Sequence, residues 1–298
     1  MLKMVMTMSK EKRVGEWLNE WLRMRSGELR PRTLEQYERL IRLHAEQLAK
    51  RKLRKLKPEH IAEVLGSLVE AGKHRTAEQL YILLRSALKD AERLGLIKDE
   101  PTQRVGRPSH RTEPHAVWTP QQQRQVLRAM KGDPAEAELM LGLLCGLRRG
   151  EIAGLRWEDV DLKRGILTIR RQRQRMPGGR LEELPPKSEA GRRIIPIPAA
   201  LRASLKARAA IGGYVCRYTP DSLSKALQRV ERRAGVPHIG MHGLRHTMAT
   251  NAVRAGVSLR VVQQIVGHAS FTLTARVYTH PDEEMLREAV DMAAAVVV

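Results

Sequence analysis

Two long stretches of this sequence repeat apolar residues at helical spacing, and a short segment between them cannot continue either one. From residue 14 to residue 94 apolar side chains recur every three or four positions, which predicts four amphipathic helices. Residues 105–118 carry two prolines and no apolar periodicity, as an interdomain linker does. The pattern therefore predicts two domains.

The expected organisation follows the chain in order. Residues 1–13 are an N-terminal extension, 14–104 a four-helix domain, 105–118 the linker, 119–280 a second domain, and 281–298 a C-terminal helix and tail. In the first domain Thr33 and Thr76, each followed three residues later by Gln, are expected to cap helices. Pro58 is expected in the first turn of the third helix.

The second domain begins with helical sequence and then changes period. Thr119 and Pro120 suit the N-cap and first position of a helix. Between residues 165 and 198 the runs ILTIRR and RRIIPIP are β-like and flank a Pro-Gly-Gly turn at residues 177–179. The expected fold class is thus mainly α, with a four-helix N-terminal domain and a mixed α+β C-terminal domain that holds a small antiparallel sheet.

The charge of the chain indicates a polyanionic partner. The formal net charge is +21, and it is not confined to a tail: residues 1–110 hold 24 basic and 15 acidic residues (net +9), and residues 111–298 hold 30 and 18 (net +12). Aromatic residues are only 3% of the chain, which argues against a single-strand binder built from stacking platforms. No apolar stretch reaches the roughly 20 residues that a membrane span requires, so a cytoplasmic protein is expected.

The sequence contains no convincing pattern for a metal site, a nucleotide site or a disulfide. His242 and His246 lie four apart, but Gly243 stands where a zincin has Glu, and no third ligand follows. No Walker loop is present. Cys145 and Cys216 show no pairing or metal spacing and are expected to be reduced structural thiols. We therefore expect no metal and no other cofactor.

Six polar residues stand where packing alone would not place them: Arg148, Lys187, His242, Arg245, His268 and Tyr278. Each alone has an ordinary structural explanation, such as a helix cap or a satisfied buried partner. They fall, however, within three longer stretches: GLRRGEIAGLRWEDVDL at 146–162, PKSEAGRRIIPIP at 186–198, and MHGLRHTMATNAVRAGVSLRVVQQIVGHASFTLTARVYTH at 241–280. Together, in this order, they resemble the active site of the tyrosine recombinases, the phage integrase family.

The resemblance implies roles that agree with the chemistry of a phosphodiester. Attack on phosphorus builds negative charge, which guanidinium groups stabilise by bidentate hydrogen bonds, and Arg148 and Arg245 are assigned to that clamp. Tyr278 is the expected nucleophile, whose phenol needs help to ionise. Lys187 is the expected general acid for the leaving 5′ oxygen. His242 and His268 are expected to relay a proton or orient the phosphate, and Glu151 to support Arg148.

The family also implies partners. The first domain corresponds to a core-DNA-binding domain, and four protomers are expected to act on two duplex attachment sites through a Holliday junction, with monomers or weak association without DNA and a possible accessory directionality factor. Basic residues in two segments are expected to contact DNA, with a solvated charged turn as the alternative for the first: Arg51, Lys52, Arg54, Lys55 and Lys57, and Arg170, Arg171, Arg173 and Arg175.

Several functions remain open at this stage. A temperate phage or mobile-element integrase without an arm-binding domain is preferred because WEDVDLKRGILTIRR and the extended hairpin look like that group. A Xer-type chromosome or plasmid dimer resolvase is the main alternative. A type IB topoisomerase and a non-catalytic DNA-binding regulator are less favoured. The apolar tail AAAVVV is expected to fray, to contact a neighbouring protomer or to act as a degradation signal.

Overall fold

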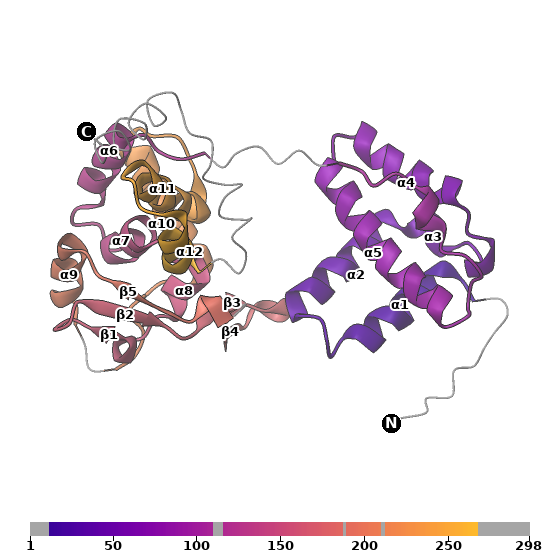
Figure 1. The fold of residues 1–298 in the computed structure, drawn as a ribbon, viewed down its shortest axis with the longest axis horizontal. Coiled ribbons are helices and arrows are strands. Elements are labelled where there is room, and N and C mark those ends of the chain that lie inside the picture. The colour runs from indigo at the N-terminus through magenta and orange to yellow at the C-terminus, as the bar shows by residue number, and fades with distance from the viewer. Residues whose placement is uncertain (1–11, 110–115, 187–188, 210–211, 268–298) are drawn as a thin grey trace, which may run out of the picture. The chain divides into compact units, whose positions relative to one another are not determined.

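The computed structural model describes residues 12–109, 116–186, 189–209 and 212–267 (Figure 1). The chain divides into two compact units, one made mainly of residues 1–112 and the other mainly of residues 113–298. Each unit has its own hydrophobic core. None of the helices in the described ranges is long and apolar enough to cross a membrane.

The first unit is built from helices alone in its described part. They are α1 (Val14–Arg25), α2 (Pro31–His44), α3 (Glu46–Ala49), η1 (Leu53–Lys55), α4 (Pro58–Glu70), α5 (His74–Arg93) and η2 (Pro101–Arg104). The apolar face of α1 is buried as its periodicity predicts, and its two tryptophans also satisfy their ring N–H groups. Trp17 donates to the carbonyl of Ala87 at 2.9 Å and Trp21 to the carboxylate of Asp90 at 2.8 Å, both on α5.

Two predicted helix caps in this unit are wrong. Helix α2 begins at Pro31 rather than after Thr33, because a proline in the first turn has its φ already set and lacks only an N–H that would be unpaired there. Helix α5 begins at His74 rather than after Thr76. The prediction that Pro58 opens a helix is confirmed, since α4 begins there.

The second unit surrounds a small sheet with helices. Its elements are α6 (Pro120–Met130), α7 (Glu136–Cys145), α8 (Arg149–Gly154), η3 (Trp157–Asp159), β1 (Val160–Asp161), β2 (Ile166–Ile169), β3 (Gln172–Arg175), η4 (Pro177–Gly179), β4 (Leu181–Leu184), η5 (Glu189–Gly191), β5 (Arg193–Pro196), α9 (Ala199–Lys206), α10 (Pro220–Ala234), α11 (Gly240–Arg254) and α12 (Leu259–Val266). Thr119 caps α6 and Pro120 is its first residue, as predicted. The predicted fold class, mainly helical with a small antiparallel sheet in the C-terminal half, is confirmed.

The strands form two antiparallel sheets rather than one hairpin. Strands β1, β2 and β5 lie in that order, with Ile169 opposite Arg193, so the two β-like runs of the sequence do pair. The chain between them folds into its own hairpin, β3 with β4, around the turn at Pro177–Gly179. Gly178 and Gly179 adopt φ angles of 80° and 87°, which suit glycine.

Helix α8 lies against the backbone of β3, and glycine makes this approach possible. A Cβ atom added to Gly154 would come within 3.0 Å of the Arg173 amide nitrogen and the Gln172 carbonyl carbon, and one added to Gly150 within 3.3 Å of the Arg173 carbonyl oxygen. The Gln172 side chain also donates to the carbonyl of Pro185 at 2.9 Å, just after β4. The hairpin is therefore fixed to the helix that follows Arg148.

Candidate active site

Helix α11 carries His242 and Arg245 with opposite exposure. Just before the helix, the Trp118 ring N–H donates to the carbonyl of Pro237 at 2.9 Å. Its side chains at 245 and 246 point into the second unit: Arg245 is 0% exposed and His246 2% exposed. His242 lies at the surface, and its ring meets that of His246 edge to face with centroids 4.5 Å apart.

The Arg245 guanidinium connects two other helix ends. It donates to the carbonyl of Gly146, at the end of α7, at 2.7 Å, and to the carbonyl of Val266, the last residue of α12. Gly146 and Gly267 both adopt the left-handed conformation that ends a helix and leaves its last carbonyls pointing outward. An arginine can satisfy such carbonyls and also matches the negative end of the helix dipole.

Arg148 is the N-cap of α8 and is partly open to solvent, with 31% of its side chain exposed. Its guanidinium donates to Glu151 at 2.7 Å and to the carbonyl of Gly267 at 2.8 Å. Glu151 in turn accepts from the Arg148 backbone N–H at 2.9 Å, as in a capping box. These contacts hold Arg148 while leaving three of its five N–H donors without a described partner.

Glu151 is the buried acidic group of this cluster, with 3% of its side chain exposed. Burial by itself raises the pKa of the carboxyl, but hydrogen bonds and charge from Arg193, together with Arg148, outweigh burial and lower that pKa to about 2. Arg193, at the start of β5, contacts both carboxylate oxygens, at 2.9 and 3.1 Å. Glu151 is therefore ionised at neutral pH and is shared by two arginines.

Three arginines thus converge on the last three carbonyls of the α12 segment. Arg193 donates to Ile265 at 2.6 Å, Arg245 to Val266, and Arg148 to Gly267 at 2.8 Å. Our sequence reasoning did not identify Arg193. The only signal for it is its place in the run RRIIPIP, and nothing in that run shows that its partners lie on α8 and α12.

The structure brings four of the predicted site residues to one region. Arg148 contacts Glu151 and Gly267, and Arg245 contacts the neighbouring Val266. His242 precedes Arg245 by about one helical turn. Lys187, His268 and Tyr278 lie outside the described residues. In the sequence, Lys187 precedes Arg193 by six positions and His268 directly follows Gly267.

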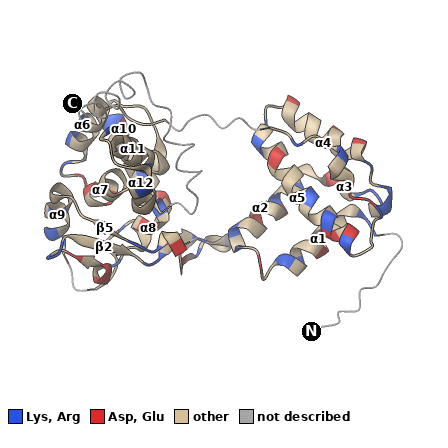
Figure 2. Cartoon of the chain, in the orientation of Figure 1, with Lys and Arg blue, Asp and Glu red and all other residues tan. Residues whose placement is uncertain are grey.

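The basic segment before α4 presents its charges to solvent. Leu53 and Leu56 are buried, while the basic residues around them are exposed: Arg51, Lys52, Arg54, Lys55 and Lys57. Some of these side chains have protein partners, as in the 3.2 Å contact from Arg54 to the carbonyl of Leu96. Figure 2 shows Lys and Arg distributed over both units.

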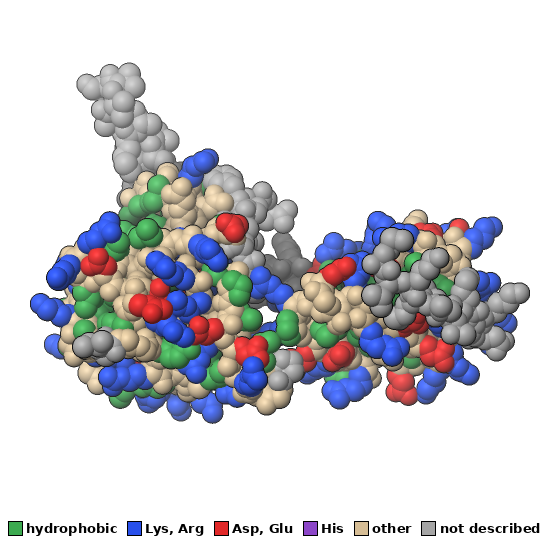
Figure 3. Space-filling model, turned by 90° about the horizontal axis from the view of Figure 1, so that it is seen from below, with side chains coloured by type: hydrophobic (Ala, Val, Ile, Leu, Met, Phe, Trp, Pro, Cys, Tyr) green, Lys and Arg blue, Asp and Glu red, His purple; other side chains and the backbone are tan. Residues whose placement is uncertain are grey.

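The arginines around β3 are largely paired with other side chains. Arg171 contacts Asp159 at 2.6 Å, Arg175 contacts Asp221 at 2.7 Å, and Arg170 is 3.4 Å from Asp159. Arg173 lies over the ring of Tyr214, 4.4 Å from its centroid. The space-filling view likewise shows basic and acidic side chains intermixed (Figure 3). These contacts fix the hairpin and reduce the charge that it offers to DNA.

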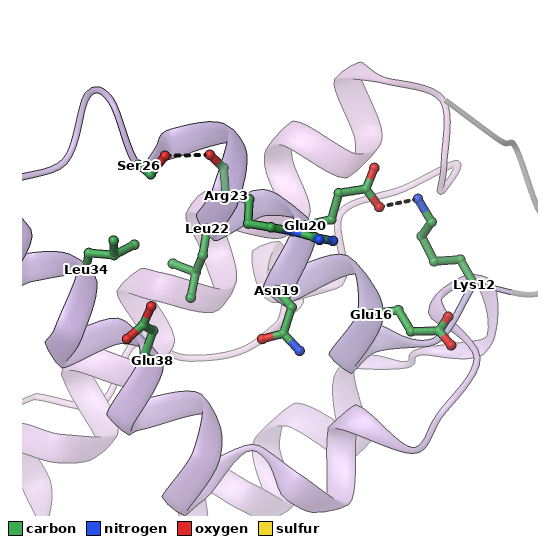
Figure 4. Close-up of a pocket in the computed structure, with 9 residues that line it drawn as sticks. All are labelled: Lys12, Glu16, Asn19, Glu20, Leu22, Arg23, Ser26, Leu34 and Glu38. Carbon is green, nitrogen blue, oxygen red and sulfur yellow. Dashed lines mark hydrogen bonds and ion pairs between the residues drawn. The ribbon is translucent and has the colours of Figure 1, made fainter. Parts of the chain in front are cut away.

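A hollow in the first unit has the wrong charge for a phosphate backbone. It lies beside α1 and α2, over Leu22 and Leu34, and Figure 4 shows Glu16, Glu20 and Glu38 around it. Two basic residues, Lys12 and Arg23, also line it, and Lys12 is paired with Glu20 at 2.6 Å. The remaining carboxylates repel DNA, so the exposed basic segment at 51–57 is the better candidate surface.

Comparison with known proteins agrees with this architecture. Residues 117–285 match the phage integrase family, and residues 14–69 match the phage integrase N-terminal SAM-like domain. The first match covers more than half of the chain and contains the whole arginine cluster. The chain therefore belongs to the phage integrase family of tyrosine recombinases, and it is a site-specific recombinase that binds, breaks and rejoins DNA.

Individual relatives are similar over most of their length. A tyrosine recombinase XerD of Neisseria meningitidis is 30% identical, with 87% of this chain and 90% of the relative covered. A XerC-like tyrosine recombinase of Caldanaerobacter subterraneus subsp. tengcongensis is 27% identical, with 89% and 77% covered. Among solved structures, the Tn1549 transposon integrase in complex with a circular intermediate DNA superposes with a TM-score of 0.81 at 20% identity, covering 94% and 99%. A lambda integrase tetramer bound to a Holliday junction gives 0.70 at 17%, covering 92% and 80%.

Proposed function

We propose that this recombinase is the integrase of a temperate phage or another mobile element, and that it cuts duplex DNA through a 3′-phosphotyrosyl intermediate. One observation supports the assignment of the cleavage site above all. Arg148 and Arg245 donate to neighbouring carbonyls at the end of α12, directly before His268 in the sequence. The chain superposes on a transposon integrase with a TM-score of 0.81, and this likeness of fold is compatible with the integrase proposal.

In the proposed reaction the Tyr278 phenol oxygen attacks the scissile phosphorus, and the bond from phosphorus to the 5′ oxygen breaks. The phenol proton passes to a histidine or to water, and Lys187 gives a proton to the leaving 5′ oxygen. A 5′ hydroxyl of the partner duplex then attacks the phosphotyrosyl bond and releases Tyr278, so that no bond energy is lost to hydrolysis.

The electrostatics of the described residues suit this chemistry. Arg148 is held by Glu151 and Gly267 but keeps donors for a non-bridging oxygen. Arg245 is fully buried, so a phosphate oxygen meets it only after the groups that cover it move. Arg148 and His242 are therefore the first groups of this cluster that DNA meets.

The proposed assembly is a homotetramer on two duplexes, and a tetramer is what the lambda integrase structure shows on a Holliday junction. An accessory factor would set the direction of recombination. We infer that the protein acts in the cytoplasm of a bacterial host, where its DNA substrate would lie. The second candidate is a Xer-type dimer resolvase, which the names of the XerC and XerD relatives favour.

A nicked suicide substrate tests the cleavage chemistry. The wild-type protein should form a covalent adduct with the 3′ phosphate, and Tyr278→Phe should bind the same duplex and form none. An adduct with Tyr278→Phe refutes the nucleophile assignment. Recombination between two plasmids that carry the element's junction sequences, compared with plasmids that carry the host's dimer-resolution site, separates integrase from resolvase.

A further inference from the structure

We propose that Arg193 is a positioning residue for DNA cleavage, which keeps Arg148 available to the scissile phosphate. The proposal rests on the assignment of Arg148 as a phosphate ligand. Arg193 is poorly placed to contact DNA directly, because only 6% of its side chain is exposed. It acts through the groups that it touches.

The contacts of Arg193 engage nearly all of its donors. Its two terminal nitrogens reach Glu151 at 2.9 and 3.1 Å, its Nε donates to Ile265 at 2.6 Å, and Nη1 also donates to the carbonyl of Gly191 at 3.1 Å. The four bonds join β5, η5, α8 and the end of α12. A planar fork of five donors can make such a set, and a single ammonium group cannot.

The first consequence concerns charge. Glu151 carries one negative charge, and Arg193 contacts both of its oxygens, so Arg148 needs to make only one side-chain contact there, at 2.7 Å. Without Arg193, the buried carboxylate would have Arg148 as its remaining cationic partner and would draw it into a bidentate pair. The Arg148 charge would then be compensated inside the protein instead of by the phosphate.

The second consequence concerns position. Arg193 packs closely on the turn that ends α12: a Cβ added to Gly267 would lie 3.0 Å from Arg193 Nη1 and 2.7 Å from the carbonyl oxygen of Ala190. Gly267 supplies the carbonyl that holds Arg148, and Val266 supplies one that holds Arg245. Arg193 thus fixes the carbonyls that set the orientation of both clamp arginines.

The test compares Arg193→Met with a matched control, Arg208→Met. Arg208 forms another buried pair in the same unit, with Glu138 at 2.7 and 2.8 Å, and it contacts none of the site residues described here. Both variants lose a buried ion pair, so both should melt at a lower temperature. At a temperature where both are folded, Arg193→Met should cleave a suicide duplex about 10- to 100-fold more slowly, with DNA affinity within about threefold of wild type. Arg208→Met should cleave at the wild-type rate.

A substrate with an uncharged methylphosphonate at the scissile position separates positioning from general loss of structure. The defect of Arg193→Met should shrink to about threefold on that substrate, because the phosphate charge that Arg148 would meet is gone. A defect of equal size on both substrates, or equal cleavage rates for Arg193→Met and Arg208→Met, overturns the proposal.

Arg193→Lys keeps the test decisive if the methionine variant does not fold. Lysine retains the charge but not the fork, so we expect cleavage about 10-fold slower than wild type. A wild-type rate for Arg193→Lys also overturns the proposal. Absence of any Tyr278-dependent adduct in the wild-type protein would instead refute the proposed function itself, so the two failures are distinguishable.

Discussion

Replacement of Glu151 by Gln should destabilise the second unit strongly and in a pH-dependent way. The carboxylate is 3% exposed and accepts four hydrogen bonds from Arg148 and Arg193. Glutamine preserves the shape but removes the charge and offers an NH₂ group to one arginine. Two guanidinium groups, one of them buried, are then left without a counter-charge.

The stability lost in Glu151→Gln can be calculated in two ways, and the two values are similar. The pKa of Glu151 falls from an ordinary value near 4.5 to about 2, and at about 1.4 kcal/mol per pH unit this corresponds to roughly 3 kcal/mol of stability at neutral pH. Breaking one partner out of a buried ion pair costs about 3–5 kcal/mol. We therefore expect the free energy of unfolding of Glu151→Gln to be about 3 kcal/mol lower than that of the wild type at pH 6.

The sign of the pH dependence follows from the depressed pKa. The contribution of Glu151 is complete above about pH 4.5, where the carboxyl ionises in the unfolded chain, and it is lost as the pH falls through about 2 in the folded chain. The difference between wild type and Glu151→Gln should therefore narrow between pH 4.5 and 2. Urea unfolding of the full chain across that range measures it. A difference below about 1 kcal/mol at pH 6, or one that stays constant as the pH falls, refutes the reasoning.

Three further predictions follow from individual contacts. Burial raises the pKa of Cys145 and Cys216 to about 12, so neither thiol should react with a thiol reagent at pH 8 until the protein is unfolded, and fast reaction of the native protein would contradict this. Gly154→Ala should lower stability by about 1–3 kcal/mol in a urea titration because its Cβ meets the β3 backbone, whereas Gly66→Ala, with open space around it, should raise stability by about 0.5–1 kcal/mol. Lys55→Ala should reduce the slope of log K against log salt for duplex binding by about 0.9, and an unchanged slope would remove Lys55 from the DNA contacts.

The sequence predicts the helices well because helical periodicity is local. The buried face of α1 and the starts of α4 and α6 agree with the pattern. The caps at Thr33 and Thr76 fail because a capping box competes with neighbouring signals, and in α2 the fixed φ of Pro31 starts the helix three residues earlier. The Pro-Gly-Gly turn is predicted, but the pairing of β3 with β4 around it is not, because the strand LEEL lacks the apolar run that marks a strand.

The site is only partly predictable for a different reason. Arg148 and Glu151 are three residues apart, so their contact is within reach of local reasoning. The partners of Arg193 lie 42 and 72 residues away in the sequence, and no local pattern relates them. Resemblance to a family identifies residues that the family's motif marks, and Arg193 is not among those that we used. Its place in the cluster becomes visible only when β5 is paired with β2 and seated beside α12.

The charges of the cluster also explain why one buried carboxylate is useful among these arginines. Over the described residues, the cluster contains three guanidinium groups, Arg148, Arg193 and Arg245, and one carboxylate, Glu151, which leaves a charge of +2. A phosphodiester carries one negative charge, and attack by an ionised nucleophile brings a second into the transition state. A fixed charge of +2 therefore complements the transition state better than the ground state, which is the condition for preorganised charge to accelerate a reaction. Without Glu151 the three arginines would repel one another and their fixed orientation would be lost, so in the proposed reaction the carboxylate lowers the total charge but keeps the arginines in a fixed arrangement.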